Sequence, residues 1–268
     1  MRWAVIAALV VGAVYLLGVA GLALGQRRLI YQPPADAKGY FPAGFDRVPL
    51  RTSDGLDLTA AYRRAANGRP TLIYFHGNGD SLAGAERMSD LLARRGYGLL
   101  LVEYRGYGDN PGKPTEDGLY RDGRAALDWL AKQGVAGSKL ILIGYSLGSG
   151  VASQLAVERG PAALVLISPF SRLTDAASHH FPYIPVQWLL RDRYASIDKL
   201  RGRHLPLLVL HGDDDRVIPW EEGRRVAEAV PGAQLDIVHG AGHELAFLPA
   251  TQVRIAAWLD GLRVANRR

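Results

Sequence analysis

The chain has 268 residues, of which 48% are hydrophobic and 22% charged, close to the usage of ordinary globular proteins. This composition excludes a disordered, collagen-like or disulfide-scaffold protein, and the absence of cysteine excludes a thiol nucleophile and thiolate metal ligands. The formal net charge of +6 is not gathered into a basic block beside aromatic residues, so we expect no nucleic-acid partner.

The first predicted element is an apolar helix near the N-terminus. The stretch Trp3–Leu24 carries no charge, and as a helix its 22 residues span about 33 Å, enough to cross a hydrocarbon core about 30 Å thick. Arg27 and Arg28 follow it at the interface position. We therefore predict a single-pass anchor over residues 1–28 in the cell membrane or an inner membrane, with its orientation left open.

Two other interpretations of this apolar segment remain. The small residues of Ala23-Leu24-Gly25 are compatible with cleavage of a signal peptide, although signal h-regions are shorter, at about 7–15 residues. A buried core helix is the third interpretation. A stretch that is apolar on all faces and longer than about 18 residues disfavours it.

The remainder is predicted to form one α/β domain over residues 46–268, joined to the anchor by a tether over residues 29–45 that contains prolines and glycines. Apolar strand-like runs alternate with helix-like stretches in this domain. The expected strands are 56–62, 71–75, 98–102, 140–143, 163–167, 207–210 and 235–238, and the expected helices are 83–95, 116–132, 147–159, 221–230 and 250–262. This alternation favours a mostly parallel central sheet flanked by helices.

One stretch of the domain departs from the alternation. The range Ser168–Leu205 has no strand candidate and contains several aromatic side chains, among them Phe181, Tyr183 and Trp188. We interpret it as a small lid insertion over about residues 169–205, folded over the sheet edge. Its apolar residues would either border a substrate site or pack the core of the insertion itself.

The strongest functional signal is a G-x-S-x-G motif that runs from Gly144 to Gly148 with Ser146 at its centre. It directly follows the expected strand 140–143 and opens the helix that begins at Leu147. A tight turn between a strand and a helix exposes the serine at the helix N-terminus, and a Cβ at either glycine would clash across that turn. We therefore predict that Ser146 is a nucleophile.

A serine hydroxyl needs an adjacent base, and the base needs an orienting carboxylate. His243 lies in a Gly-Ala-Gly-His-Glu loop after the last expected strand, and we predict it as the base; His239, at the strand end, is the alternative. Asp215 is the predicted acid, because its position after strand 207–210 leaves a turn long enough to reach the histidine loop. The two aspartates before it are expected to lie in a solvated turn.

Acyl transfer also needs two backbone N–H donors for the oxyanion. Leu147, the residue after the nucleophile, is predicted to supply one. The other is expected from the His-Gly-Asn-Gly loop after strand 71–75, and we assign it to Asn78. His76 at the start of this loop is expected to be structural.

We expect neither a metal nor an organic cofactor. His239 and His243 are four residues apart, but the glycines between them disfavour a helix, and no third ligand is apparent. No G-x-G-x-x-G follows an expected strand, and Pro114 stands where a P-loop requires serine or threonine.

Taken together, these motifs resemble the α/β-hydrolase superfamily over about residues 45–262. The resemblance is carried by His76-Gly77-Asn78-Gly79, Glu103-Tyr104-Arg105-Gly106-Tyr107-Gly108, the G-x-S-x-G motif, His211-Gly212 with Asp215, and Gly242-His243. With its apolar N-terminal segment the chain is similar to the membrane-anchored α/β-hydrolase-domain proteins, whose relatives include serine aminopeptidase-like hydrolases and acyl-protein thioesterases. The family commonly carries a serine after the Tyr-Arg-Gly-Tyr-Gly run, where this chain has Asp109-Asn110, so that serine's role does not carry over.

The expected function is a membrane-anchored serine hydrolase that cleaves carboxylic esters or thioesters through an acyl-enzyme on Ser146. Its expected partners are the membrane and a small-molecule or lipid-like acyl substrate. Two alternatives stay open. An aminopeptidase-like amidase would need a carboxylate pair for the substrate amine, for which Glu103 and Asp109 are available. A non-catalytic binding protein on the same fold is the other, and an intact triad argues against it.

Overall fold

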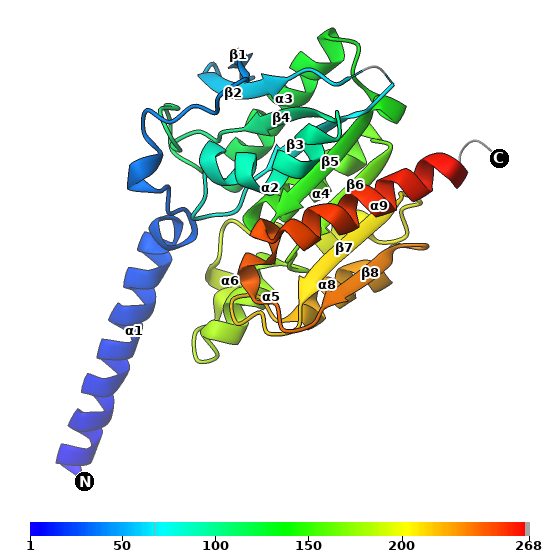
Figure 1. Cartoon of the computed structure of the whole chain (residues 1–268). Helices are drawn as coiled ribbons and strands as arrows, with labels where there is room; N and C mark the ends of the chain where they lie inside the picture. The colour runs from blue at the N-terminus through cyan, green and yellow to red at the C-terminus, as the bar shows by residue number, and fades with distance from the viewer. Residues whose placement is uncertain (67, 266–268) are drawn as a thin grey trace.

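The computed structural model describes residues 1–66 and 68–265, so residues 67 and 266–268 of the predicted domain lie outside the described residues. Figure 1 shows a long helix, α1 (Arg2–Ile30), projecting from an α/β domain. Among the described residues, α1 is the one helix long and apolar enough to cross a membrane, and none of its most apolar stretch is buried. The interpretation as a buried core helix is therefore wrong.

The centre of the domain is one eight-stranded sheet in the order β1-β2-β4-β3-β5-β6-β7-β8. The strands are β1 (Asp46–Arg51), β2 (Asp57–Arg63), β3 (Thr71–Phe75), β4 (Gly98–Val102), β5 (Leu140–Tyr145), β6 (Ala163–Ile167), β7 (Leu207–Gly212) and β8 (Gln234–Val238). The pairs along β4-β3-β5-β6-β7-β8 are parallel, whereas β2 pairs antiparallel with both β1 and β4. This confirms the predicted mostly parallel sheet.

The edge strand β1 is absent from the predicted strands. Its sequence Asp-Arg-Val-Pro-Leu-Arg carries three charges and a proline, and only Val48 and Leu50 are buried. An edge strand tolerates proline because one side of its backbone has no partner strand. A pattern this polar therefore gives no signal of a buried strand.

Helices cover both faces of the sheet, as predicted. They are α2 (Leu82–Arg94), α3 (Glu116–Lys132), α4 (Leu147–Arg159), α8 (Trp220–Glu228) and α9 (Pro249–Ala265), with short 3-10 turns η1 (Ala35–Ala37), η2 (Gly137–Lys139) and η3 (His243–Phe247). One apolar cluster joins the sheet to α2 and α9, and the other joins it to α3, α4 and α8. Every residue of the four central strands β3 to β6 is buried, because alternate side chains enter opposite clusters.

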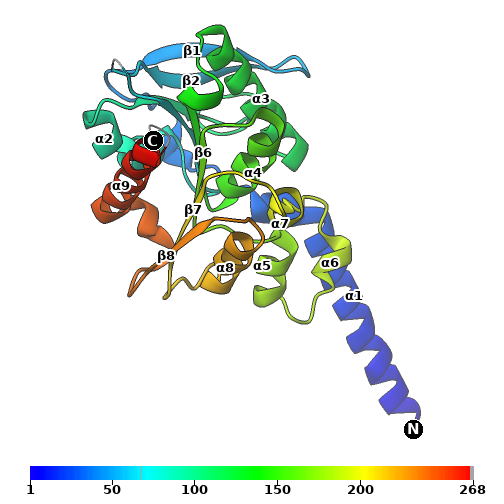
Figure 2. The same cartoon turned by 90° about the vertical axis from the view of Figure 1, so that its right-hand side faces the viewer.

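The segment between β6 and β7 contains three short helices and no strand, as predicted for the lid insertion. They are α5 (Leu173–His180), α6 (Val186–Leu189) and α7 (Ser196–Leu200). Figure 2 shows α5 and α6 on the side of the domain from which α1 projects. The lid follows the carboxyl end of β6, so it lies at the edge of the sheet where ligand sites of parallel α/β proteins form.

Candidate active site

Ser146 occupies the turn between β5 and α4. Its backbone, with φ 50° and ψ −117°, is in a region that L-residues rarely adopt, and its N–H donates a hydrogen bond of 2.9 Å to the carbonyl oxygen of Ile167. The two glycines of the motif approach each other across this turn. A Cβ on Gly144 would lie 2.5 Å from the carbonyl oxygen of Gly148, so the steric reason for glycine holds in the structure.

Gly148 has even less room, and its substitution tests the tightness of this turn. A Cβ there would lie 2.0 Å from the carbonyl oxygen of Phe75 in β3, a backbone atom that cannot rotate away. We expect Gly148→Ala to lower the free energy of unfolding by about 1–3 kcal/mol in denaturant titrations.

The control for this variant is Gly79→Ala in the neighbouring loop. A Cβ on Gly79 would meet nothing within 4 Å, and its φ lies outside the positive region, so we expect a change within about 0.5 kcal/mol. Equal unfolding free energies for the two variants would contradict the close approach at Gly148.

Three side chains from separate loops form one chain of hydrogen bonds. Nε2 of His243 lies 3.0 Å from Oγ of Ser146, and Nδ1 of His243 lies 2.8 Å from Oδ2 of Asp215. These residues follow β5, β7 and β8, whose carboxyl ends meet at one edge because the strands are parallel. The structure thus brings together the three residues that the sequence pattern selects.

Asp215 is held as a carboxylate. Its side chain is fully buried, and Oδ1 accepts two backbone N–H groups, from Val217 at 2.9 Å and Ile218 at 2.8 Å. Burial acts to raise the pKa of Asp215, but hydrogen bonds from His211 and His243 outweigh it and bring the pKa below the ordinary value. The ionised carboxylate accepts the Nδ1–H of His243, which leaves Nε2 of that ring to accept a proton.

His211 also belongs to this network. The sequence shows His211 only as part of the His211-Gly212 motif and assigns it no role in the site. Its imidazole is fully buried, with Nε2 3.0 Å from the carbonyl oxygen of Ile218 and 3.3 Å from Oδ2 of Asp215. Both neighbours are acceptors, so Nε2 carries the proton. His211 therefore positions the Asp215 carboxylate. In the sequence, the signal for this role is a histidine at the end of an apolar strand, four residues before Asp215.

The alternative base lies outside this network. His239 has an imidazole that is 87% exposed, and its Nδ1 lies 2.7 Å from Oδ2 of Asp213. Oδ1 of Asp214 lies 3.3 Å from Nε of the exposed Arg216. The two aspartates before Asp215 therefore lie in a solvated turn, as expected. Within residues 1–66 and 68–265, no group of three His, Asp or Glu side chains is arranged to hold a metal ion.

The loop after β3 lies against the nucleophile. A Cβ on Gly77 would be 3.4 Å from the Cβ of Ser146. Oδ1 of Asn78 accepts hydrogen bonds from the hydroxyl of Tyr107 at 3.2 Å and from the N–H of Gln32 at 2.8 Å, which fixes the Asn78 side chain. Asn78 and Leu147, the predicted oxyanion donors, both border the cavity at Ser146.

A buried ion pair supports this loop from behind. His76 is fully buried; its Nε2 lies 3.0 Å from Oε1 of Glu103 and its Nδ1 lies 2.8 Å from the carbonyl oxygen of Gly77. Burial acts to lower the pKa of His76, but the contact with Glu103 raises it above the ordinary value. The other oxygen of Glu103 accepts the N–H of Leu82 at 3.1 Å, so His76 and Glu103 have structural roles.

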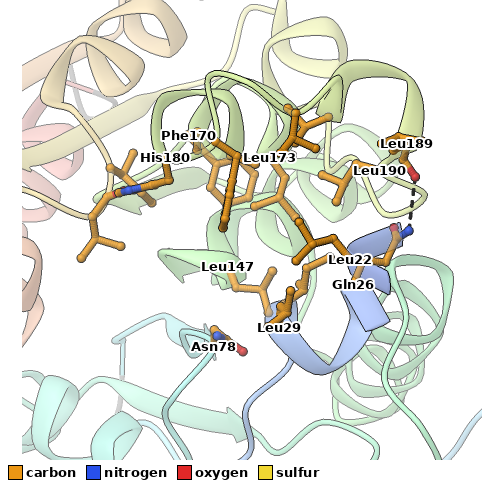
Figure 3. A pocket seen from close by; sticks show the side chains of 18 of the residues that line it. Leu22, Gln26, Leu29, Asn78, Leu147, Phe170, Leu173, His180, Leu189 and Leu190 are labelled. Atoms are coloured by element: carbon orange, nitrogen blue, oxygen red, sulfur yellow. Dashed lines mark hydrogen bonds between the residues drawn. The ribbon is translucent and has the colours of Figure 1, made fainter. Parts of the chain in front are cut away.

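An apolar cavity of about 310 Å³ opens beside Ser146. Figure 3 shows that side chains of α1, such as Leu22 and Leu29, and of the lid, such as Phe170 and Leu173, surround it together with Asn78 and Leu147. Its lining comprises Leu22, Ala23, Gln26, Leu29, Ile30, Asn78, Ser146, Leu147, Phe170, Leu173, Ala176, Ala177, His180, Phe181, Ile184, Val186, Leu189, Leu190, Val217 and Ile218. None of these described residues is an aspartate, glutamate, lysine or arginine, and the volume lies within the range of ligand pockets, about 300–1,000 Å³.

The helix α1 forms part of this cavity, whereas its apolar sequence predicts only a membrane anchor. Gln26 is buried, and its Nε2 donates to the carbonyl oxygen of Leu189 at 3.2 Å, a contact visible in Figure 3. His180 of the lid also borders the cavity. A pattern of apolar residues along a helix does not reveal which of them face a pocket.

A sequence-family model, similar proteins and similar solved structures all indicate an alpha/beta hydrolase. Residues 70–188 match the sequence model of the alpha/beta hydrolase fold. An uncharacterized protein of Mycobacterium tuberculosis is 40% identical over 226 residues, which cover 81% of this chain and 80% of that protein. The lysophosphatidylserine lipase ABHD12 of Danio rerio is 32% identical over 203 residues, covering 68% of this chain but only 52% of the lipase. Among solved structures, the Pyrococcus furiosus esterase Pf2001 superposes with a TM-score of 0.70 at 19% identity, covering 87% of this chain and 97% of the esterase.

Proposed function

The chain belongs to the α/β-hydrolase family of hydrolases, and we propose that it is a membrane-anchored serine hydrolase that cleaves carboxylic esters or thioesters with apolar acyl groups. One observation carries the proposal: the hydrogen-bonded chain of Ser146, His243 and Asp215 ends at an uncharged, apolar cavity. A nucleophile with its base and acid in this geometry performs acyl transfer, and the cavity accommodates an apolar acyl group.

The proposed reaction proceeds in two halves. Oγ of Ser146 attacks the acyl carbon while its proton passes to Nε2 of His243, and Asp215 stabilises the resulting imidazolium. The N–H groups of Asn78 and Leu147 stabilise the oxyanion. His243 then gives the proton to the leaving alcohol or thiol, which departs and leaves an acyl group on Ser146. In the second half, His243 takes a proton from water as the water attacks the acyl carbon. The bond to Oγ of Ser146 then breaks, Oγ receives that proton back from His243, and the acid is released.

The cavity and its surroundings favour this activity over an aminopeptidase-like amidase. The amidase would need free carboxylates near the substrate amine. Both oxygens of Glu103 are bonded, to His76 and to the N–H of Leu82, and Asp109 accepts the exposed N–H of Gly39 at 3.1 Å. Neither carboxylate borders the cavity. The name of the Danio rerio relative, a lysophosphatidylserine lipase, also supports a lipid-like acyl substrate.

We propose further that residues 1–28 are retained as a membrane anchor, followed by the tether 29–45 and the hydrolase domain 46–268. The support is structural as well as compositional. Leu22 and Ala23 form part of the cavity wall. Cleavage of a signal peptide after the small residues near Gly25 would remove that wall and open the cavity.

A labelling and substrate panel on the full-length protein in detergent tests the proposal. We expect a fluorophosphonate to label one residue, Ser146, and we expect hydrolysis of p-nitrophenyl esters and acyl thioesters. Hydrolysis of aminoacyl arylamides alone would establish the amidase instead. A folded protein with neither labelling nor turnover would support the binding protein.

Acyl-chain selectivity is expected to depend on α1. Leu22 points into the cavity, so Leu22→Trp fills space that a long acyl chain would occupy. We expect kcat/KM for long-chain esters to fall about tenfold or more, because each methylene that loses its place in an apolar pocket costs about 1–3 kcal/mol. Short esters should be hydrolysed at nearly the normal rate.

Leu24→Trp is the control for this change. Leu24 is 82% exposed on the same helix and does not border the cavity. The same chain-length profile in both tryptophan variants would show that α1 does not shape the acyl site.

A further inference from the structure

The segment Phe181–Leu190, here called the lid tip, has the sequence FPYIPVQWLL and carries no charge. Three of its aromatic side chains are exposed: Phe181 by 44%, Tyr183 by 86% and Trp188 by 85%. An exposed apolar patch marks a surface that binds a partner or a membrane.

The lid tip lies beside the apolar part of α1. The hydroxyl of Tyr15 donates a hydrogen bond of 2.6 Å to the carbonyl oxygen of Tyr183. Figure 2 shows α5 and α6 beside α1, with the loop between them pointing along the helix toward its N-terminal end. Tyr15 precedes Arg27 by twelve residues, about 18 Å along a helix axis. A hydrocarbon core is about 30 Å thick, so a core that begins near Arg27 extends past the level of the lid tip.

Charged residues follow the lid tip at the same level at which they follow the apolar part of α1. Arg27 forms two hydrogen bonds to Asp192, with Nε 3.0 Å from Oδ2 and Nη2 3.2 Å from Oδ1. Oε1 of Gln26 accepts the N–H of Arg191 at 2.7 Å. These contacts join the lid and α1 into one unit, and they lie where both segments change from apolar to charged. On both segments, the boundary between apolar and charged residues therefore lies at one level.

The cavity crosses that boundary. Ser146 and Asn78 border it on the domain side, whereas Leu22 and Ile184 border it on the side of the apolar helix and the lid tip. Leu22 precedes Arg27 by five residues, about 7 Å toward the middle of the span. The apolar end of the cavity is thus placed within reach of lipid acyl chains.

We propose that the lid tip is inserted in the same bilayer as α1, and that the cavity takes the acyl chain of a membrane lipid directly from the lipid phase. This inference rests on the proposed membrane-anchored hydrolase and adds its interaction surface and its substrate source. The aromatic side chains of the lid tip lose their exposure to water in the bilayer. The ester group then reaches Ser146 at the level of the charged boundary.

Because the chain has no cysteine, single-cysteine variants can report depth. We would label Tyr183→Cys and Trp188→Cys with a fluorophore in the full-length protein, reconstituted in phosphatidylcholine vesicles that contain acyl-chain nitroxide lipid. Leu9→Cys, on the exposed surface of α1, reports insertion of the helix. Ser138→Cys reports the background. Ser138 is exposed and lies just before the amino end of β5, whereas the lid lies at the carboxyl ends of the strands. We expect quenching at positions 183 and 188 comparable with that at 9, and none at 138.

The outcomes separate this inference from the proposed activity. Quenching at 9 without quenching at 183 and 188 would overturn the inserted lid tip and leave the anchor in place. No quenching at 9 would overturn both. Turnover is measured on the unlabelled wild type, so an inactive protein with a quenched lid tip would overturn the hydrolase and keep the membrane surface.

A second measurement links the surface to substrate capture. Tyr183 and Trp188 do not border the cavity, so charges there leave the site unchanged. We expect the double variant Tyr183→Asp, Trp188→Asp to lower the hydrolysis of a long-chain ester embedded in vesicles about tenfold or more, because aspartate is costly in hydrocarbon. The rate on a soluble short ester should not change. Equal rates on the embedded ester for wild type and variant would overturn capture from the lipid phase.

Discussion

Replacing Ser146 with alanine is expected to lower kcat for ester hydrolysis by about 10⁴-fold or more, while KM changes little. The side chain removed is the one whose Oγ lies 3.0 Å from Nε2 of His243, and no other nucleophile takes its place in that geometry among the described residues. The residual rate is expected to come from the proposed oxyanion donors and from substrate binding. The measurement is steady-state kinetics on a p-nitrophenyl ester with the full-length protein in detergent.

Ser153→Ala is the matched control for this variant. Ser153 is a buried serine of α4, the helix that follows Ser146, and its hydroxyl donates a hydrogen bond to the carbonyl oxygen of Ser149, away from the cavity. We expect its activity to stay near the wild-type value. If Ser146→Ala kept more than about a tenth of the activity, the acyl-enzyme mechanism would be wrong.

The double variant Ser146→Ala, His243→Ala gives a sharper test of the proposed catalytic unit. Side chains that act in one chain of proton transfers have strongly non-additive effects, because removing either one abolishes the same step. We expect the double variant to be about as slow as Ser146→Ala alone. Losses that multiply would show that the two side chains act independently.

Replacing Arg105 with methionine is expected to lower the free energy of unfolding by about 3–5 kcal/mol. Nη1 of Arg105 lies 2.7 Å from Oδ2 of Asp54, and Nε lies 2.8 Å from Oδ1 of Asp122, whose side chain is fully buried. The Arg105 side chain is itself only 7% exposed. Methionine fills part of the volume but leaves the Asp122 carboxylate buried without a cation. Urea unfolding of the full-length protein in detergent measures the loss.

Arg51→Met is the control for this substitution. Its ion pair with Asp57 has side chains that are 65% and 76% exposed, so we expect a change of at most about 1 kcal/mol. A similar small change for Arg105→Met would mean that the buried cluster adds no stability.

The difference in free energy of unfolding between wild type and Arg105→Met should become smaller in acid. The hydrogen bond from Arg105 lowers the pKa of Asp54 in the folded state. A lowered carboxyl pKa contributes stability above the unfolded value of about 3.9, and that stability is lost as pH falls. Burial already raises the pKa of Asp122 above its ordinary value, although Arg105 acts to lower it. In the variant that cation is lost, so the pKa of Asp122 rises further, and the variant loses more stability than the wild type as pH rises. Unfolding at pH 7 and near pH 4 checks the sign.

Much of the fold follows from local patterns. Continuous apolar runs such as 71–75 and 140–143 predict central strands because both faces of those strands are buried, and the structure confirms the mostly parallel sheet between two layers of helices. The polar edge strand β1 gives no such pattern. Its place depends on pairing with β2, a contact between segments rather than a property of either one.

The candidate site divides in the same way. The G-x-S-x-G turn can be predicted from the sequence because its geometry depends on five consecutive residues, with glycines where a Cβ would clash. The choice between His239 and His243 depends on contacts across the chain. Ser146 and His243 are 97 residues apart, and only the folded sheet shows which imidazole reaches the serine.

The sequence alone determined the apolar helix, the alternation of strands and helices and the serine turn, because each depends on the spacing of nearby residues. Tertiary structure decided that His211 supports the acid, that His76 and Glu103 brace the loop after β3, and that α1 forms a wall of the cavity. These features arise where distant segments meet, and a spacing rule cannot report them because burial and hydrogen bonding between such segments exist only once the chain has packed.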